Sequence, residues 1–314
     1  RTDNMSAFMN SAPYKNVAGD AANGRLSHAY LLVCPDVRNL RGFLKELAKL
    51  IFGADERVGG LIEREMYADC LVLPAEGSKF TVADAKTVTD ESYIKPVEGD
   101  KKLFVLDGVQ DMNASAQNKL LKVLEEPPAN VCFLLGATNE FAVLSTVKSR
   151  AKRLDLYTFP EKEIEKHIRE KFPHRRDAAE IAAVCGGVLG KAEELAEGGS
   201  LQEAAEEAAA FALNLSVSSA ISGARKYADK EKAAAFLPML GLVYRDIVML
   251  KAGREDLLLS GGEKDLLTRA SARYSAAALV NALEKIAETE RDLKFNANLS
   301  ASLEMLFIGI LEGR

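Results

Sequence analysis

The first half of the chain alternates short apolar, β-rich runs with stretches of helical periodicity, and this alternation limits the possible folds more than any other feature. Five runs have the length and composition of strands: 29–33, 70–73, 103–107, 131–136 and 153–157. Most are apolar throughout, as expected for strands that are buried on both faces of a sheet. The order of strands and helices predicts an α/β fold with a parallel five-stranded sheet covered by helices.

The best-marked helix is predicted at 114–126. Asn113 can cap its first free amides, apolar residues recur along one face, and two prolines follow it. After Tyr157 the strand signals end, and Pro and Gly residues separate short helices before a long helical region rich in Ala and Leu. We therefore expect an α/β domain at 1–158, a small helical domain at 159–200 and an all-α domain at 201–314.

Composition argues against several classes of protein. The 314 residues include 41 Lys and Arg against 46 Asp and Glu, and the net charge of −5 does not suit a protein that coats DNA. The first five residues, Arg1 to Met5, include an acidic residue where an export signal would carry positive charge, and no uninterrupted apolar run approaches the ~18 residues of a membrane span. We therefore expect a cytoplasmic protein that has no membrane partner.

The four cysteines lie far apart and form no Cys-x-x-Cys pair. We therefore expect four buried thiols, no zinc and no other metal. The pairs Lys101-Lys102 and Arg175-Arg176 are too isolated to mark a nucleic-acid patch. We expect both pairs on solvated faces.

An α/β sheet of this kind would hold a nucleotide after its first strand, where a glycine-rich turn leads into a helix. The segment at 34–41 lacks every glycine of the pattern G-x-x-x-x-G-K-[ST], together with its lysine and its hydroxyl. Leu40 stands where the lysine should be, and Asp36 would bring negative charge to the phosphates. The other side chains of this degenerate loop include Cys34, Asn39 and Arg41. We predict no phosphate cradle and no bound cofactor.

The second part of such a site is an aspartate at the end of the third strand, which orients Mg²⁺, followed by a residue that activates water. Asp107 is present at this place, but Gly108 follows it and cannot act as a base. We expect Asp107 to accept backbone hydrogen bonds in the turn instead.

One ordered set of motifs is more specific than the others. The pattern N-x-L-L-K-x-L-E-E-P-P occupies 118–128 and precedes the strand at 131–136, after which Ser149-Arg150 follows. At these residues the chain resembles the clamp-loader branch of the AAA+ proteins, which carry this pattern and an S-R-C arginine motif. The resemblance runs from about residue 28 to residue 299. It implies a nucleotide-binding-type domain, a helical lid, and a helical collar through which five subunits form an open ring.

Departures from the family pattern indicate the type of subunit. The hydrolysing γ/τ subunits have an intact phosphate loop and a lid arginine, where this chain has Gly190, while Thr138 occupies the sensor-1 position. The δ subunit lacks the S-R-C arginine, whereas this chain keeps Ser149-Arg150 and has Ala151 in place of the cysteine. The resemblance therefore implies a subunit without ATPase activity that supplies Arg150 in trans to an ATP site on its neighbour.

The family also implies γ/τ and δ subunits, the sliding clamp and primer-template DNA as partners. Asn113, Ser115 and Lys119 are candidates for contacting DNA phosphates, and each is equally well explained as a cap or a solvated side chain. Two other readings stay open. An active AAA+ ATPase with an atypical loop would bind and hydrolyse ATP, and a helical adaptor unrelated to replication would leave the motifs at 118–128 and 149–150 unexplained.

Overall fold

The computed structural model describes residues 6–198, 201–260, 264–292 and 298–313. The N-terminal residues considered above for an export signal lie outside this set. The described chain divides into two compact units. The first comprises the residues up to 167 together with 188–191, and the second comprises 168–187 and the residues from 192 onward.

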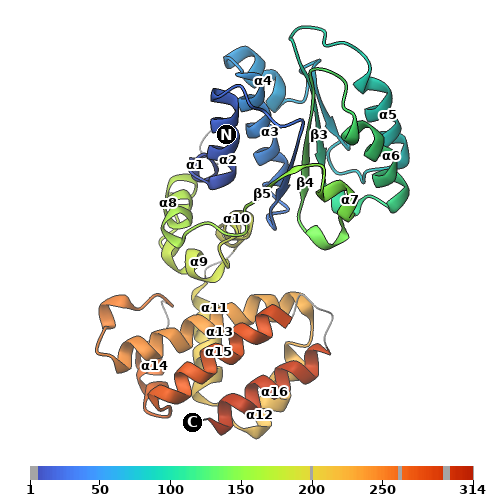
Figure 1. Ribbon diagram of the computed structural model, residues 1–314. Helices are drawn as coiled ribbons and strands as arrows, with labels where there is room; N and C mark the ends of the chain where they lie inside the picture. The colour runs from blue at the N-terminus through green and yellow to red at the C-terminus, as the bar shows by residue number, and fades with distance from the viewer. Residues whose placement is uncertain (1–5, 199–200, 261–263, 293–297, 314) are drawn as a thin grey trace. The chain divides into compact units, whose positions relative to one another are not determined.

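A five-stranded parallel sheet forms the centre of the first unit (Figure 1). Its strands are β1 (Ala29–Val33), β2 (Cys70–Leu73), β3 (Lys102–Asp107), β4 (Val131–Ala137) and β5 (Lys152–Asp155). They lie in the order β2-β3-β4-β1-β5, and each neighbouring pair is parallel. The predicted α/β fold with a five-stranded sheet is therefore confirmed. The strand predicted at 153–157 ends earlier, because β5 pairs only with β1, which itself ends at Val33.

Helices cover both faces of this sheet (Figure 1). α3 packs against β3 and β4 on one face, and α2 packs against α3 and β5. On the opposite face α5 and α6 pack together over an apolar cluster that includes Leu31, Phe104 and Phe133. The helices of this region are α1 (Ser6–Met9), α2 (Ala12–Ala22), α3 (Leu40–Phe52), α4 (Glu56–Glu63), α5 (Val82–Ser92), α6 (Ala114–Glu125) and α7 (Ser145–Lys148). Two 3₁₀ turns, η2 (Val109–Asp111) and η3 (Glu140–Ala142), follow β3 and β4.

The predicted helix after Asn113 is confirmed. The side chain of Asn113 accepts a hydrogen bond from the Ala116 amide, as an N-cap residue does. Ala116, Leu120, Val123 and Leu124 are buried along one face, and the helix ends at Glu125, just before the two prolines. The last turn of this helix lies beside Arg150, which pairs with Glu125.

The remaining helices are α8 (Glu161–Lys171), α9 (Ala178–Val184), α10 (Leu189–Glu197), α11 (Gln202–Leu213), α12 (Val217–Lys226), α13 (Lys230–Lys251), α14 (Lys264–Ser271), α15 (Ala276–Asp292) and α16 (Leu299–Glu312), with a 3₁₀ turn η4 (Glu255–Leu257). The predicted all-helical C-terminal region is confirmed. The contact pattern groups 168–187 with these C-terminal helices. The division into domains at 1–158, 159–200 and 201–314 therefore stays a prediction.

α13 is the central helix of the second unit. It packs against α11, α14 and α15, and Leu240, Val243 and Tyr244 are fully buried. By length and composition alone this 22-residue helix could also cross a membrane, although 56% of its most apolar window is buried in the protein. The search for uninterrupted apolar runs missed it because Arg245 and Asp246 interrupt the run. Asp246 is fully buried, where it pairs with Arg245 and accepts hydrogen bonds from two backbone amides.

Candidate functional site

The loop after β1, where a nucleotide would bind, is folded around one of its own carboxylates. Asp36 is 2% exposed. Its carboxylate accepts hydrogen bonds from the backbone amide of Asn39 at 3.0 Å, from the side-chain amide of Asn39 at 3.1 Å, and from the backbone amide of Gly190 at 2.8 Å. Because anions bind well at the free amides of a helix N-terminus, Asp36 occupies there the kind of position that a phosphate could take.

Gly190 permits this close approach. A Cβ atom at Gly190 would overlap Oδ1 of Asp36 and would lie 2.8 Å from Cβ of Arg38. The position where the hydrolysing relatives carry a lid arginine therefore has no room for a side chain in this conformation. The small residue at 190 and the buried carboxylate of Asp36 thus belong to one contact.

Two residues of this loop belong to the core: Cys34, and Leu40, which stands where the pattern has its lysine. Leu40 is 1% exposed and packs so near β4 that a Cβ atom on Gly136 would lie 3.3 Å from its Cδ1 atom. Burial raises the pKa of the Cys34 thiol to about 12, which keeps it protonated and unreactive at neutral pH. Cys34 and Leu40 thus contribute to packing, and Leu40 offers no cation where the lysine of an intact loop would stand.

Arg41 connects α3 to the end of β3 and to the residues around Glu65 and Pro74. Its guanidinium pairs with both carboxylate oxygens of Glu65 at 2.7 Å, donates to the Pro74 carbonyl at 3.0 Å, and reaches Oδ2 of Asp107 at 3.3 Å. Sequence reasoning did not identify Glu65 or this network. The expectation that Asp107 accepts backbone hydrogen bonds was wrong, because its described partner is the Arg41 side chain.

The state of Asp107 does not suit a metal ligand. Burial raises the pKa of this carboxyl group, and the nearby Arg41 opposes that rise only in part. Gly108 follows with φ of 79°, a left-handed conformation that favours glycine and begins η2. An ion-paired aspartate followed by glycine provides neither an open Mg²⁺ ligand nor a base, so these residues do not fit the metal that an active site of this kind would need.

Thr138, at the sensor-1 position, lies just past the end of β4. Its backbone amide donates to the side-chain oxygen of Gln110 in η2 at 3.1 Å. Gln110 therefore links the turn after β3 to the turn after β4. This contact positions the backbone of Thr138, and a sensor-1 role for Thr138 stays a prediction.

Arg150 lies at a different edge of the first unit, directly after α7. One of its terminal nitrogens, Nη1, donates to the Thr146 carbonyl at 2.6 Å and to the Ser149 hydroxyl at 3.2 Å. The other, Nη2, pairs with Glu125 in the last turn of α6. The Arg150 side chain is 29% exposed. The geometry thus presents a guanidinium at the surface, held by groups from two helices.

A buried glutamine supports the segment that carries Arg150, and sequence reasoning missed it. Gln117 is 2% exposed in α6. Its amide nitrogen donates to the carbonyls of Met112 and Ala142 at 3.1 Å, and its oxygen accepts from the Leu144 amide at 2.8 Å. The loop between η3 and α7 is therefore fixed to α6 by one side chain. The only signal in the sequence is a polar residue on the apolar face of a helix.

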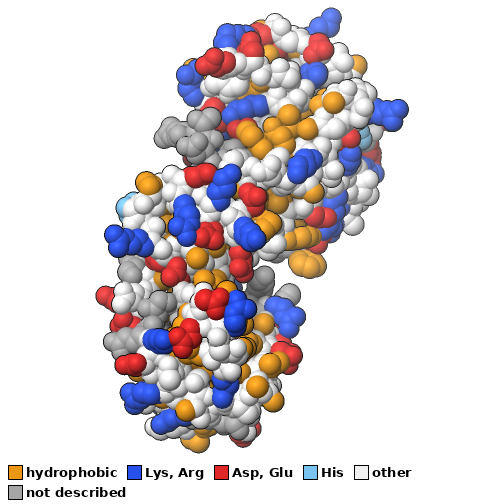
Figure 2. Space-filling model, turned by 90° about the vertical axis from the view of Figure 1, so that its left-hand side faces the viewer, with side chains coloured by type: hydrophobic (Ala, Val, Ile, Leu, Met, Phe, Trp, Pro, Cys, Tyr) orange, Lys and Arg blue, Asp and Glu red, His pale blue; other side chains and the backbone are white. Residues whose placement is uncertain are grey.

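The three candidate DNA contacts lie around the N-terminal half of α6. Asn113 serves as the N-cap, whereas Ser115 and Lys119 are exposed. Contact with DNA through these residues stays a prediction. A different face of the protein, drawn in Figure 2, shows Lys and Arg side chains interspersed with Asp and Glu side chains.

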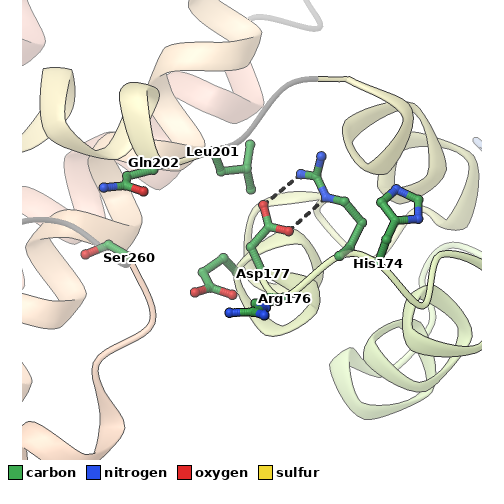
Figure 3. Close-up of a pocket in the computed structure, with 8 residues that line it drawn as sticks. His174, Arg176, Asp177, Leu201, Gln202 and Ser260 are labelled. Carbon is green, nitrogen blue, oxygen red and sulfur yellow. Dashed lines mark hydrogen bonds and ion pairs between the residues drawn. The ribbon is translucent and has the colours of Figure 1, made fainter.

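The expected solvation of two basic pairs was partly wrong. Lys102 is 2% exposed and pairs with Glu91 at 2.8 Å. Arg175 has a side chain that is 10% exposed and pairs with Asp177 through two hydrogen bonds of 2.7 and 2.8 Å (Figure 3). It borders a hollow of about 360 Å³ in the second unit, together with His174, Arg176, Asp177, Glu180, Leu201, Gln202 and Ser260. Isolated basic pairs can therefore be structural.

Comparison with known proteins supports the resemblance predicted from the motifs. A family model described as DNA polymerase III, delta subunit, matches residues 9–160. The δ′ subunit of DNA polymerase III from Bacillus subtilis is 25% identical over 309 residues, which cover 92% of each chain. The tau/gamma subunit from Haemophilus influenzae is 30% identical over 166 residues, which are 48% of this chain and 23% of that protein. The match to δ′ thus spans both chains, whereas the match to tau/gamma spans part of each.

Similar solved structures include a γ subunit-related protein from Thermotoga maritima, with 16% identity, a TM-score of 0.42 and coverage of 95% and 99% of the two chains. The Bacillus subtilis clamp loader δ protein has 14% identity and a TM-score of 0.36, with coverage of 95% and 99%. Structural similarity with TM-scores this low says nothing about the function of the chain. In its motifs, and in sequence over 92% of its length, the chain is similar to a DNA polymerase III clamp-loader subunit.

Proposed function

We propose that this protein is a δ′-like subunit of a replicative clamp loader, which does not hydrolyse ATP and donates Arg150 in trans to an ATP site on a neighbouring subunit. The observation that supports this proposal most is the pairing of Asp107 with Arg41. The carboxylate that would orient Mg²⁺ is already engaged within its own chain. Asp36 reinforces this, because its negative charge fills the space where phosphates would need positive charge.

Arg150 is suited to act on another subunit. Phosphoryl transfer spreads negative charge over the γ-phosphate oxygens, and a guanidinium placed there stabilises the transition state. The planar fork of arginine can donate two parallel hydrogen bonds to such oxygens, which lysine cannot. Arg150 is exposed in part and lies in a motif that the family uses for this purpose, whereas the degenerate loop of the same chain offers it no nucleotide.

The contact between Asp36 and Gly190 gives the subunit a further property. In an ATPase of this family the nucleotide itself would connect the loop after β1 to the lid. Here the loop and the first turn of α10 are joined by a hydrogen bond within the protein. We infer that this segment keeps one arrangement throughout the ATP cycle, so the subunit serves as a fixed stator. Its partners would be the γ/τ and δ subunits, with the sliding clamp and primer-template DNA, in the cytoplasm.

The test is reconstitution of the clamp loader with Arg150→Ala. We expect turnover at the single ATP site that depends on Arg150 to fall by about 10³-fold or more, because this is the range measured for arginine fingers. DNA-stimulated ATPase of the whole complex and clamp loading should both fall, and Arg150→Lys should restore little. Arg57→Ala is the matched control, since Arg57 is an exposed, ion-paired arginine of the same unit. Unchanged ATPase and clamp loading with Arg150→Ala would reject the proposal.

A further inference from the structure

We propose that Glu125 is a positioning residue for Arg150, which holds the guanidinium in the orientation needed to meet a phosphate on the neighbouring subunit. This inference rests on the function proposed above for Arg150. It concerns a residue of the N-x-L-L-K-x-L-E-E-P-P motif whose part in that chemistry the motif itself does not explain.

The contacts of Arg150 come from two different helices. Thr146 and Ser149 lie in α7 and at its end, and they hold Nη1. Glu125 lies in the last turn of α6 and holds Nη2. A side chain attached at both ends of its fork keeps one orientation, whereas α7 alone would leave the guanidinium free to rotate about its terminal bonds. The ion pair therefore defines where the side chain points.

The attachment leaves donors for a ligand. A guanidinium has five N–H groups. Thr146 and Ser149 take those of Nη1 and Glu125 takes one of Nη2, so that Nε–H and the other Nη2–H have no partner within the described ranges of the chain. Because these contacts fix the guanidinium in advance, less conformational entropy is lost when it meets the phosphate in the transition state. Glu125 can thus assist the reaction without touching the nucleotide.

The size of the effect follows from exposure. Glu125 is 47% exposed and Arg150 is 29% exposed, so water and salt screen their attraction. We therefore expect Glu125→Gln to lower the Arg150-dependent turnover by about two- to five-fold, far less than removal of Arg150. Gln keeps the shape and a hydrogen-bond acceptor but loses the charge. Glu125→Asp should recover part of the loss.

The experiment is a double-mutant cycle in the reconstituted complex. Wild type, Glu125→Gln, Arg150→Ala and the double variant are compared by kcat and KM of the DNA-stimulated ATPase. We expect Glu125→Gln to lower kcat with KM for ATP unchanged, and to have no further effect when Arg150 is already Ala. The matched control is Glu126→Gln, because Glu126 is the exposed neighbour and its side chain has no described partner. Raising the salt concentration should narrow the gap between wild type and Glu125→Gln.

Three results would overturn the inference. They are an unchanged or raised kcat for Glu125→Gln, an equal loss for Glu126→Gln, or a loss that persists in the Arg150→Ala background. Each can occur while Arg150→Ala alone abolishes turnover at its site, which would leave the proposed function intact. If Arg150→Ala instead left the ATPase and clamp loading unchanged, the proposed function itself would be rejected.

Discussion

The pocket after β1 and the edge at α7 belong to the same α/β unit, but they use charge in opposite ways. In the pocket, Asp36 and Asp107 are both satisfied by groups of the chain itself, an amide of α10 and the guanidinium of Arg41. At the edge, Arg150 is held at both of its terminal nitrogens, yet it keeps N–H donors that no described group uses. In the proposed function, internal pairing replaces nucleotide binding in the first region, while the second region keeps Arg150 available for a neighbour's site.

The comparison predicts that the two regions respond differently to mutation. Changes in the pocket should alter stability and leave the ATPase of the complex unchanged. Changes at the edge should alter the ATPase and leave stability nearly unchanged. Variants of Arg150 and Glu125 test the edge, whereas variants of Gly190 and Asp107 test the region around Asp36 and Arg41, called the pocket here.

The largest effect in the pocket is expected from Gly190→Ala. The new methyl group would overlap Oδ1 of Asp36, so the loop or the start of α10 must move and the hydrogen bond between them must break. We expect a loss of about 1–3 kcal/mol in the free energy of unfolding, measured by urea denaturation. Gly19→Ala is the control. Gly19 lies inside α2 with nothing within 4 Å of its added methyl group, so this change should stabilise by about 0.5–1 kcal/mol. Equal stability of Gly190→Ala and wild type would show that the contact is not formed.

A smaller effect is expected from Asp107→Asn, and it depends on pH. Burial raises the pKa of Asp107 in the folded protein, in spite of Arg41. A carboxyl whose pKa is higher folded than unfolded opposes folding above the folded pKa, and this penalty vanishes below the unfolded value near ~3.9. The Asn variant should therefore be slightly more stable at pH 7, by less than about 1 kcal/mol, with the difference shrinking as the pH falls toward 4. Urea denaturation of both proteins at several pH values measures this.

The same variant also separates the two kinds of site. In an ATPase, removing the carboxylate that orients Mg²⁺ stops turnover. Asp107→Asn in this subunit should leave the DNA-stimulated ATPase of the reconstituted complex unchanged. A large loss of ATPase would mean that Asp107 takes part in catalysis and would remove the distinction between the pocket and the edge.

Much of the fold could be predicted because the strands are continuous apolar runs. The runs at 29–33 and 70–73 coincide with β1 and β2, because both runs are apolar throughout and a polar residue precedes each of them. Lys102 extends β3 by one residue beyond the predicted run. A buried lysine of this kind is recognisable only when its partner Glu91 is placed beside it.

For the nucleotide region, the sequence predicted only which phosphate-binding groups are missing. The loop at 34–41 shows that the phosphate ligands are absent, but not what replaces them. Arg41 and Glu65 are 24 residues apart, and no local pattern connects them. The three hydrogen bonds of Gln117 likewise depend on how α6 meets the loop before α7. Sequence reasoning found residues whose chemistry is conveyed by a motif, and it missed those whose role arises from tertiary contact.

The central claim is that this chain has no working nucleotide pocket of its own. Calorimetric titration of the purified chain with Mg²⁺-ATP, and with a slowly hydrolysed analogue, tests it most directly. We predict no saturable heat of binding in either titration, because Asp36 is hydrogen-bonded to Gly190 and Asp107 is paired with Arg41 within the chain itself. Saturable, Mg²⁺-dependent binding by the isolated chain would contradict the account.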